Sequence, residues 1–192
     1  TKAKPEDVVF TIENLIVEDS RKIERVKNFS LEVRKGEIVG IAGIDGNGQK
    51  ELVEAITCLK KVKAGKISIN GVEIQNTSTH NVIEHGISTI HEDRQKRGLI
   101  LDFPVKYNFI TEKYNKSKFS KHFVLNNKAI NKFTDDCIKK YDIRPEDCAS
   151  KPVSALSGGN QQKVVIAREL SNDPELLIAF QPTRGLEDRK ST

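Results

Sequence analysis

Apolar and polar residues alternate near the start of the chain, and this alternation predicts strands. Residues 8–17 are rich in β-branched side chains, and apolar side chains occupy every second position of residues 29–33. Residues 37–43 (EIVGIAG) form an almost continuous apolar run, which is typical of a strand buried on both faces. A cluster of glycines follows, and residues 49–61 then carry apolar side chains at helical spacing. We therefore expect a strand, a glycine loop and a helix in direct succession.

Three later segments have the patterns of short strands. The stretch GKISINGVEI (residues 65–74) predicts a hairpin that turns at its Asn-Gly pair. Residues 87–90 and 174–180 are short apolar runs, and they predict two further buried strands.

Helical patterns lie between these strands. Residues 80–86 predict a short helix that ends at Gly86. Residues 107–152 are rich in Lys and Asn, with helical periodicity and no strand pattern, which indicates an inserted helical subdomain. Residues 156–170 begin with a glycine turn and continue as a helix. Strands that alternate with helices predict an α/β fold with a mostly parallel sheet and an antiparallel edge.

The composition is that of a soluble globular chain. Of its 192 residues, 36% are hydrophobic and 31% are charged, and no apolar run approaches the ~20 residues of a membrane span. The net charge of +5 is spread along the sequence, so we expect no nucleic-acid partner. The chain contains no methionine, not even at position 1, and we expect it to be a segment of a longer protein.

The cysteines and histidines indicate neither disulfides nor a metal site. Three cysteines form no C-x-x-C pair, and the four histidines share no metal-ligand spacing with them. An odd number of cysteines without a signal peptide favours a reducing cytosol.

The stretch GIDGNGQK has the glycines of a phosphate-binding loop but lacks its lysine. The standard pattern G-x-x-x-x-G-K-[ST] is met at Gly43 and Gly48, but Gln49 takes the lysine position and Lys50 takes the Ser/Thr position. On this stretch alone three readings stay open: a degenerate nucleotide site, a different site, or a chance cluster of glycines. The candidate nucleotide- or phosphate-binding residues are Gly43, Asp45, Gly46, Asn47, Gly48, Gln49, Lys50 and Glu51.

A second motif, LSGGNQQK, decides between these readings. It resembles the LSGGQ signature of ATP-binding-cassette (ABC) proteins and, as in that family, lies beyond a helical insert and just before a buried strand. The resemblance covers nearly the whole chain and implies the P-loop NTPase fold. The signature residues are Leu156, Ser157, Gly158, Gly159, Asn160 and Gln161. The chain then divides into an ABC α/β core (1–106), a helical subdomain (107–155), the signature helix with the last core strand (156–187), and a truncated or foreign tail (188–192).

The chain resembles one branch of the ABC family more closely. The stretches that carry this resemblance are GEIVGIAGIDGNGQKEL, HEDRQKRGL, LSGGNQQK and QPTRGLE. These stretches are similar to the second cassette of tandem ATPases that drive bacterial import of simple sugars and nucleosides, where the loop lysine is commonly missing. The resemblance implies a first cassette, with an intact lysine, in the N-terminal half of the same protein. It also implies membrane permease subunits as partners and a cytoplasmic location at the inner face of the cell membrane. The transported solute is chosen by other subunits.

Residues that hydrolysis needs are replaced at several positions. Phosphoryl transfer requires charge neutralisation at the phosphates, a held Mg²⁺ and a positioned water. Gln49 lacks the lysine's charge, and Lys50 would repel the metal. Where the family's last strand ends in Asp for Mg²⁺ and Glu for the water, this chain has Phe180 and Gln181. In the family a polar loop usually begins with a glutamine, and in this chain a glutamate takes that position. The residues of this polar loop are Glu92, Asp93 and Arg94.

We therefore expect no intact catalytic residue and no Mg²⁺ in this domain's own site. The glycines still let backbone N–H groups point at an anion, so the loop allows weak ATP binding. Lys50 either faces solvent or replaces the missing lysine, which would make the domain an active ATPase. The intact signature implies that Ser157, Gly158 and Gly159 cap an ATP held by the partner cassette. A non-transport ABC protein is a further alternative, although the chain has no coiled-coil insert.

The polar loop and the segment after it are expected to meet the permease. Residues 92–104 combine basic side chains with the apolar run LILDFP, and the helical insert follows directly. Alternatively, Leu99, Leu101 and Phe103 pack on the core of this domain.

Overall fold

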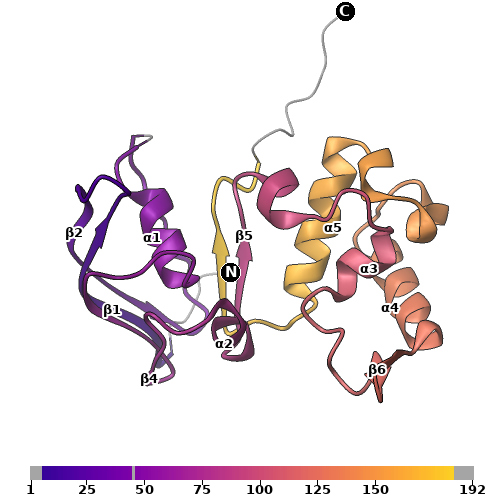
Figure 1. Ribbon diagram of the computed structural model, residues 1–192, viewed down its shortest axis with the longest axis horizontal. Helices are drawn as coiled ribbons and strands as arrows, with labels where there is room; N and C mark the ends of the chain where they lie inside the picture. Colours follow the sequence, from indigo (N-terminus) through magenta and orange to yellow (C-terminus); the bar gives the residue numbers. More distant parts are fainter. Residues whose placement is uncertain (1–5, 45, 184–192) are drawn as a thin grey trace, which may run out of the picture. The chain divides into compact units, whose positions relative to one another are not determined.

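The computed structural model describes residues 6–44 and 46–183, and the chain divides into two compact units, Thr1–Ile87 and Ser88–Thr192 (Figure 1). The first unit contains β1 (Val8–Glu18), β2 (Glu24–Arg34), α1 (Gln49–Ile56), β3 (Ala64–Ile69), β4 (Val72–Glu73) and α2 (Thr79–Glu84). From the boundary onward follow β5 (Ile87–Ile90), η1 (Arg94–Gly98), α3 (Val105–Ile110), β6 (Ser120–Lys121), β7 (Val124–Leu125), α4 (Asn127–Lys140), η2 (Glu146–Ser150), η3 (Val153–Ala155), α5 (Gly158–Leu170) and β8 (Leu176–Ala179). Within the described ranges, no helix has both the length and the apolarity needed to cross a membrane.

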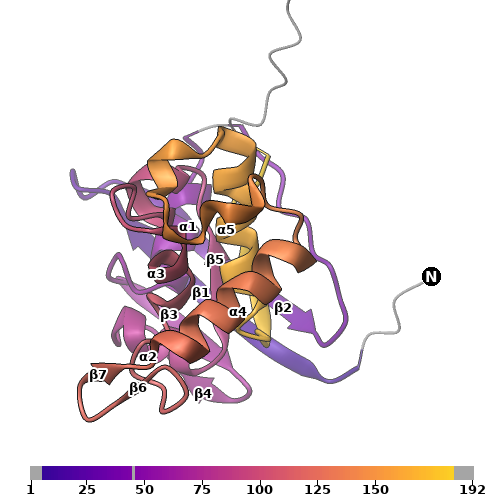
Figure 2. The same ribbon diagram turned by 90° about the vertical axis from the view of Figure 1, so that its right-hand side faces the viewer.

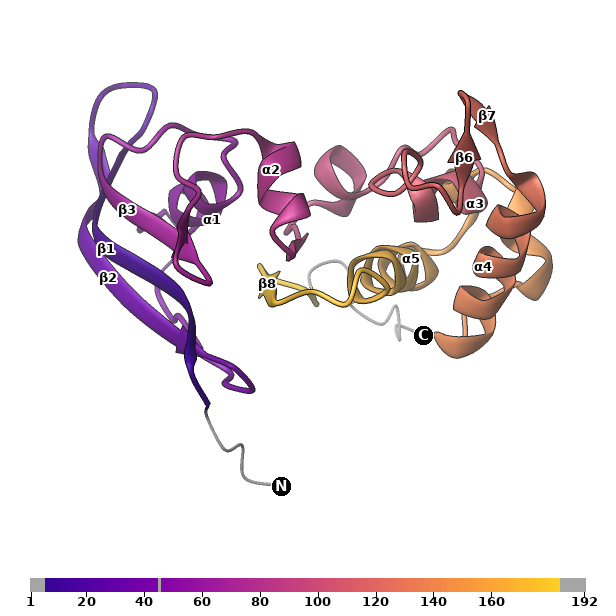
Figure 3. The same ribbon diagram turned by 90° about the horizontal axis from the view of Figure 1, so that it is seen from below.

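An antiparallel sheet of order β2-β1-β3-β4 forms the first unit, and α1 lies against it (Figure 3). β1 pairs with β3 so that Phe10 stands opposite Ile69 and Ile12 opposite Ile67, and all four side chains are buried. Alternate apolar residues of β1 thus build the core, which confirms the strands predicted at the start of the chain and the hairpin of β3 and β4.

The buried strand predicted at residues 37–43 is wrong. These residues lie in no strand, and the side chain of Ile38 is 95% exposed. A strand needs a neighbour that takes up its backbone N–H and C=O groups, and none of the described strands pairs with this segment. The apolar run is therefore an irregular connection between β2 and the glycine loop.

The second unit packs its helices around one apolar core. Phe109 of α3, Ile138 of α4 and Val164 of α5 are buried together there, and Figure 2 shows these helices gathered around α5. The predicted strand at 87–90 and the predicted helix at 156–170 are confirmed.

The last predicted strand is present but is less buried than expected. β8 pairs with β5, and the N–H of Phe180, just after β8, donates to the carbonyl of Ile90 at 2.9 Å. Residues of β8 alternate between half-buried and exposed. Among the described strands β8 has β5 as its neighbour and no second one, so the expectation of full burial is wrong.

The expectation of no strand between residues 107 and 152 is also wrong. β6 and β7 form a short antiparallel hairpin, with Ser120 opposite Leu125 and Lys121 opposite Val124. Its turn residues are His122 and Phe123. Hairpin turns usually carry Asn or Gly, so the sequence gives no signal at this turn. The rest of the segment is helical, in α3, α4 and shorter turns.

Candidate functional site

The glycine loop lies in the first unit and forms a tight turn before α1. The N–H of Asn47 donates to the carbonyl of Ile44 at 3.2 Å. Gly46 and Gly48 have φ values of 86° and 93°, and Gly48 is the N-cap residue of α1 without a side-chain cap. The first backbone N–H groups of α1 are therefore not satisfied by a capping side chain, as an anion-binding end requires. Asp45, another predicted phosphate-binding residue, lies outside the described residues.

The side chain of Gln49 lies beside the first glycine of this loop. A Cβ added to Gly43 would meet the Gln49 Nε2 at 2.0 Å, so the amide fills the space next to that glycine. Lys50 is exposed, and Glu51 forms an ion pair with Lys60 at 4.0 Å. The backbone suits an anion, but the Lys50 ammonium, at the position where the pattern has a Ser or Thr hydroxyl, has no oxygen to bind Mg²⁺ and carries a charge that repels it. The loop residues therefore do not fit a held Mg²⁺.

Replacing Gly48 by Ala is expected to lower the free energy of unfolding by about 1–3 kcal/mol. A Cβ there would lie 2.3 Å from the carbonyl oxygen of Arg25 in β2, and φ of 93° is a conformation that alanine rarely adopts. Denaturant unfolding measures the change. Gly46→Ala is the matched control, because Gly46 also has positive φ but a Cβ there meets no atom within 4 Å. Equal losses in both variants would contradict the close approach of the loop to β2.

The signature motif lies at the N-terminus of α5 in the second unit. The hydroxyl of Ser157 accepts from the backbone N–H of Asn160 at 3.4 Å and from its Nδ2 at 3.0 Å. Ser157 and Gly159 are exposed, whereas Leu156 is buried in the core. A Cβ added to Gly159 would meet no atom within 4 Å. Packing therefore does not require glycine at this position, and the helix end with Gly158 and Gly159 is open to an anion.

Gln161, predicted as a signature residue, is buried and holds the turn that precedes α5. Its Nε2 donates to the carbonyls of Val153 at 3.3 Å and Leu156 at 3.1 Å. Its Oε1 accepts from the Nε2 of Gln95 in η1 at 3.4 Å. Gln161 thus links the signature to the segment that follows the polar loop.

The polar loop begins a single π-helical turn. Asp93 is its N-cap, and its Oδ1 accepts from the N–H groups of Gln95 and Lys96, both at 3.1 Å. Glu92 and Arg94 on either side are half-buried.

The apolar residues after the polar loop divide between core and surface. Leu99 is buried in the core of the second unit, and Leu101 packs against that core. Phe103 is 49% exposed. The core alternative therefore holds for the first two side chains, whereas Phe103 and also Ile100, which is 44% exposed, remain open to solvent.

Phe180 and Gln181 lie at the end of the last strand. Phe180 offers no oxygen to a metal, and Gln181 is exposed with φ of 46°. The Nε2 of Gln162 in α5 donates to the carbonyl of Pro182 at 2.8 Å. The second unit thus brings together the polar loop, the signature and the end of the last strand. Among the described residues, no group of three or more His, Cys, Asp or Glu side chains is arranged to hold a metal ion.

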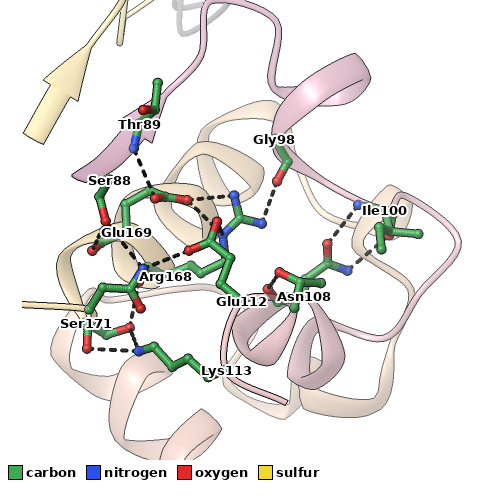
Figure 4. A network of polar contacts seen from close by, with 12 residues as sticks. Ser88, Thr89, Gly98, Ile100, Asn108, Glu112, Lys113, Arg168, Glu169 and Ser171 are labelled. Carbon is green, nitrogen blue, oxygen red and sulfur yellow. Dashed lines mark hydrogen bonds and ion pairs between the residues drawn. The ribbon is translucent and has the colours of Figure 1, made fainter. Parts of the chain in front are cut away.

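Sequence reasoning missed a buried ion pair in α5, shown in Figure 4. Arg168 donates through Nε and Nη2 to the Oε1 of Glu169 at 2.9 and 2.7 Å, and through Nη1 to the carbonyl of Gly98 at 2.7 Å. The N–H of Thr89 in β5 donates to the other oxygen of Glu169 at 3.2 Å. Burial raises the pKa of the Glu169 carboxyl, and the charge of Arg168 opposes this. The pair therefore ties α5 to the end of η1 and to β5.

Further polar side chains surround this pair. The Oε1 of Glu112 lies 3.8 Å from the Nε of Arg168, and its Oε2 accepts from Asn172 at 2.8 Å. The ammonium of Lys113 donates to the carbonyl and hydroxyl of Ser171 at 2.9 and 2.8 Å, and burial lowers the pKa of this amine to about 8. The signal in the sequence is the Arg-Glu pair that follows the apolar residues Val164–Ala167 of α5.

Comparison with known proteins identifies relatives of the chain. A sequence profile of the family described as ABC transporter matches residues 26–184. The chain is 48% identical over 185 residues to the guanosine import ATP-binding protein NupO of Bacillus subtilis (strain 168), and 46% identical over 187 residues to the nucleoside import ATP-binding protein NupA of Lactococcus lactis subsp. cremoris (strain MG1363). Each match covers 96% of this chain and 36% of the relative, so the chain spans about a third of the length of these curated relatives.

Solved structures share the fold. The dimeric structure of a post-hydrolysis state of the ATP-binding cassette MJ0796, bound to ADP and Pi, matches with a TM-score of 0.72 at 25% identity, over 94% of this chain and 77% of that one. The ATP-binding cassette MJ1267 matches with a TM-score of 0.76 at 20% identity, over 94% and 71%. These similarities confirm the predicted fold class.

Proposed function

Because the chain belongs to the ABC transporter family of ATP-binding proteins, we propose that it is a cassette of an importer for nucleosides or simple sugars whose own nucleotide site is degenerate. Its role is to supply the signature motif to the ATP site of a partner cassette. One observation carries the proposal. An exposed and intact signature coexists, in one chain, with a glycine loop whose lysine position holds the neutral Gln49.

The degenerate site is supported by substitutions that all affect the same reaction. Gln49 brings no charge to the phosphates, and its amide lies beside Gly43 in the loop. Lys50 is exposed, which argues against its replacing the missing lysine. Phe180 and Gln181 provide neither a metal ligand nor a base. The loop backbone still favours an anion, so we propose weak ATP binding there without Mg²⁺.

The signature role is supported by the open end of α5. Ser157 caps the helix, which by itself explains a serine but not the two glycines after it. Glycine lowers helix stability by about 1 kcal/mol relative to alanine, and a Cβ on Gly159 would meet nothing. A glycine that packing does not require, at a helix N-terminus, is explained by the close approach of a phosphate.

The partners follow from the same family membership. We propose that the partner cassette is the N-terminal half of the same protein and that both act on membrane permease subunits, without nucleic acid. The chain would then lie in the cytoplasm at the inner face of the cell membrane, attached through the permease. Phe103, exposed beside the buried Leu99, is the residue of residues 92–104 best placed to contact a permease.

The isolated domain is expected to show negligible Mg²⁺-ATPase activity. Turnover should lie far below the ordinary enzyme range, which begins at about 1 per second. Gln49→Lys alone should not restore it, because the metal ligand and the base are still missing. A steady-state phosphate-release assay measures both proteins.

The matched control restores four of the replaced positions. Gln49→Lys, Lys50→Thr, Phe180→Asp and Gln181→Glu together should raise turnover at least tenfold above Gln49→Lys alone. Turnover near 1 per second in the unmodified domain would instead show an active ATPase and overturn the degenerate site. If that activity also disappeared in Lys50→Ala, Lys50 would be the residue that replaces the missing lysine.

A further inference from the structure

The β6–β7 hairpin presents an aromatic ring at its tip. Phe123 is 107% exposed, and Val124 beside it is 70% exposed. Both turn residues have positive φ, 51° for His122 and 66° for Phe123. Figures 2 and 3 show this hairpin extending from the helices α3 and α4 of its own unit. A large apolar side chain is therefore held out into solvent on a short, defined turn.

The turn itself does not require these residues. The β3–β4 hairpin makes a turn with positive φ at Asn70 and Gly71, which are the residues such turns favour. His122 and Phe123 occupy the same conformation at a cost in free energy, because bulky side chains rarely adopt it. Residues held in such conformations cluster at active sites, ligand clamps and switch regions, so a function is a reasonable hypothesis for this turn. The presence of phenylalanine at position 123 is therefore better explained by a contact with a binding partner than by the needs of the turn.

The hairpin is surrounded by positive charge. Between residues 113 and 134 the sequence contains no Asp or Glu. The lysines of this stretch are Lys113, Lys116, Lys118, Lys121, Lys128 and Lys132. Apart from the half-buried Lys113 all of them are exposed. The side chain of Tyr114 is also 59% exposed. Aromatic rings among several exposed lysines are the combination that an anionic membrane surface attracts.

We propose that the β6–β7 hairpin binds an anionic phospholipid surface, with Phe123 inserted at the interface and the lysines on the headgroups. A protein partner is less well supported, because a stable protein interface needs about 800 Å² per partner and disfavours lysine at its centre. A lipid surface needs only a few inserted side chains and a basic surround. The contact would be direct and additional to any attachment through a permease.

The test is co-sedimentation of the full-length protein with vesicles. Binding is expected to vesicles of phosphatidylcholine with 30% phosphatidylglycerol, to be much weaker to pure phosphatidylcholine, and to fall in high salt. Phe123→Gly should weaken partition about tenfold or more. Lys121, Lys128 and Lys132 changed together to Gln should weaken it roughly a hundredfold.

Matched controls separate binding from folding. Phe123→Gly should leave the melting temperature unchanged or raise it, because glycine adopts the turn conformation without strain. Ile23→Ala, and the triple change Lys22→Gln, Lys27→Gln and Lys35→Gln, alter exposed side chains in the first unit. Both variants should leave the partition into vesicles unchanged. Absence of binding to anionic vesicles, or equal losses in hairpin and control variants, would overturn the proposal. A crosslink from position 123 to a protein subunit in place of lipid would also overturn it.

Discussion

Replacing Gly158 by Asp is expected to reduce ATP turnover of the assembled importer more than a hundredfold while leaving this domain as stable as before. A carboxylate in the first turn of α5 suits the helix dipole, so the fold has no reason to be weakened. The same carboxylate would stand against the γ-phosphate of an ATP held by the partner cassette. Ser157→Ala removes a hydroxyl donor at that point, and loss of one such donor typically costs ~10²–10³ in rate. Transport and turnover are measured in the full-length protein with its permease.

A second serine cap in the chain provides the control. Ser157→Ala also removes an N-cap, which costs about 1 kcal/mol of stability. Ser78 caps α2 in the same way, accepting from the N–H of Asn81 at 3.1 Å. Ser78→Ala should therefore lose similar stability and keep full turnover. Normal turnover in both signature variants, with normal assembly, would mean that the signature is a structural remnant.

Arg168→Ala is expected to lower the free energy of unfolding by about 3–5 kcal/mol, because it leaves the buried Glu169 without its counter-charge. The side chain of Glu169 is almost fully buried, and Glu112 lies close to the same guanidinium. The variant also frees the carbonyl of Gly98 at the end of η1. Urea unfolding of the domain gives the change. A loss below about 1 kcal/mol would mean that the pair contributes no more to stability than a weak surface ion pair does.

This loss should depend on pH. Burial already raises the pKa of Glu169 in the folded protein, and removing Arg168 would raise it further. An acid whose pKa is higher in the folded state binds its proton more strongly there, so stability falls as pH rises from the unfolded pKa toward the folded pKa. The variant should therefore be less destabilised at pH 5 than at pH 8. Combining Arg168→Met with Glu169→Gln removes both charges and should cost less than Arg168→Ala alone.

The sequence predicts elements well where periodicity and turn residues agree. Alternation predicts β1 and β2, an Asn-Gly pair predicts the hairpin at Asn70 and Gly71, and a glycine turn followed by helical periodicity predicts the signature helix. The segment at 37–43 was mispredicted because apolarity shows that a strand is favoured but not that a neighbouring strand is present to pair with it. The β6–β7 hairpin was missed because His122 and Phe123 are unusual turn residues.

The spacing of glycines and polar residues in two motifs, and not the chemistry of any single residue, predicts the candidate site. GIDGNGQK and LSGGNQQK identify the loop and the helix end whose geometry the structure describes. The motif does not reveal the contacts of Gln161, whose amide turns inward to Val153 and Leu156 and toward Gln95. The Arg168–Glu169 pair was not foreseen, since neighbouring opposite charges in a helix usually indicate an exposed surface.

Residues 38–44 carry three isoleucines, and no described strand lies paired beside them. Ile38 and Ile44 are largely exposed, and the stretch contains neither a charge nor a proline. Such a stretch is a template for edge-to-edge aggregation, because its free backbone groups pair with those of another chain. We therefore expect self-association of the isolated domain in concentrated solution to involve this segment.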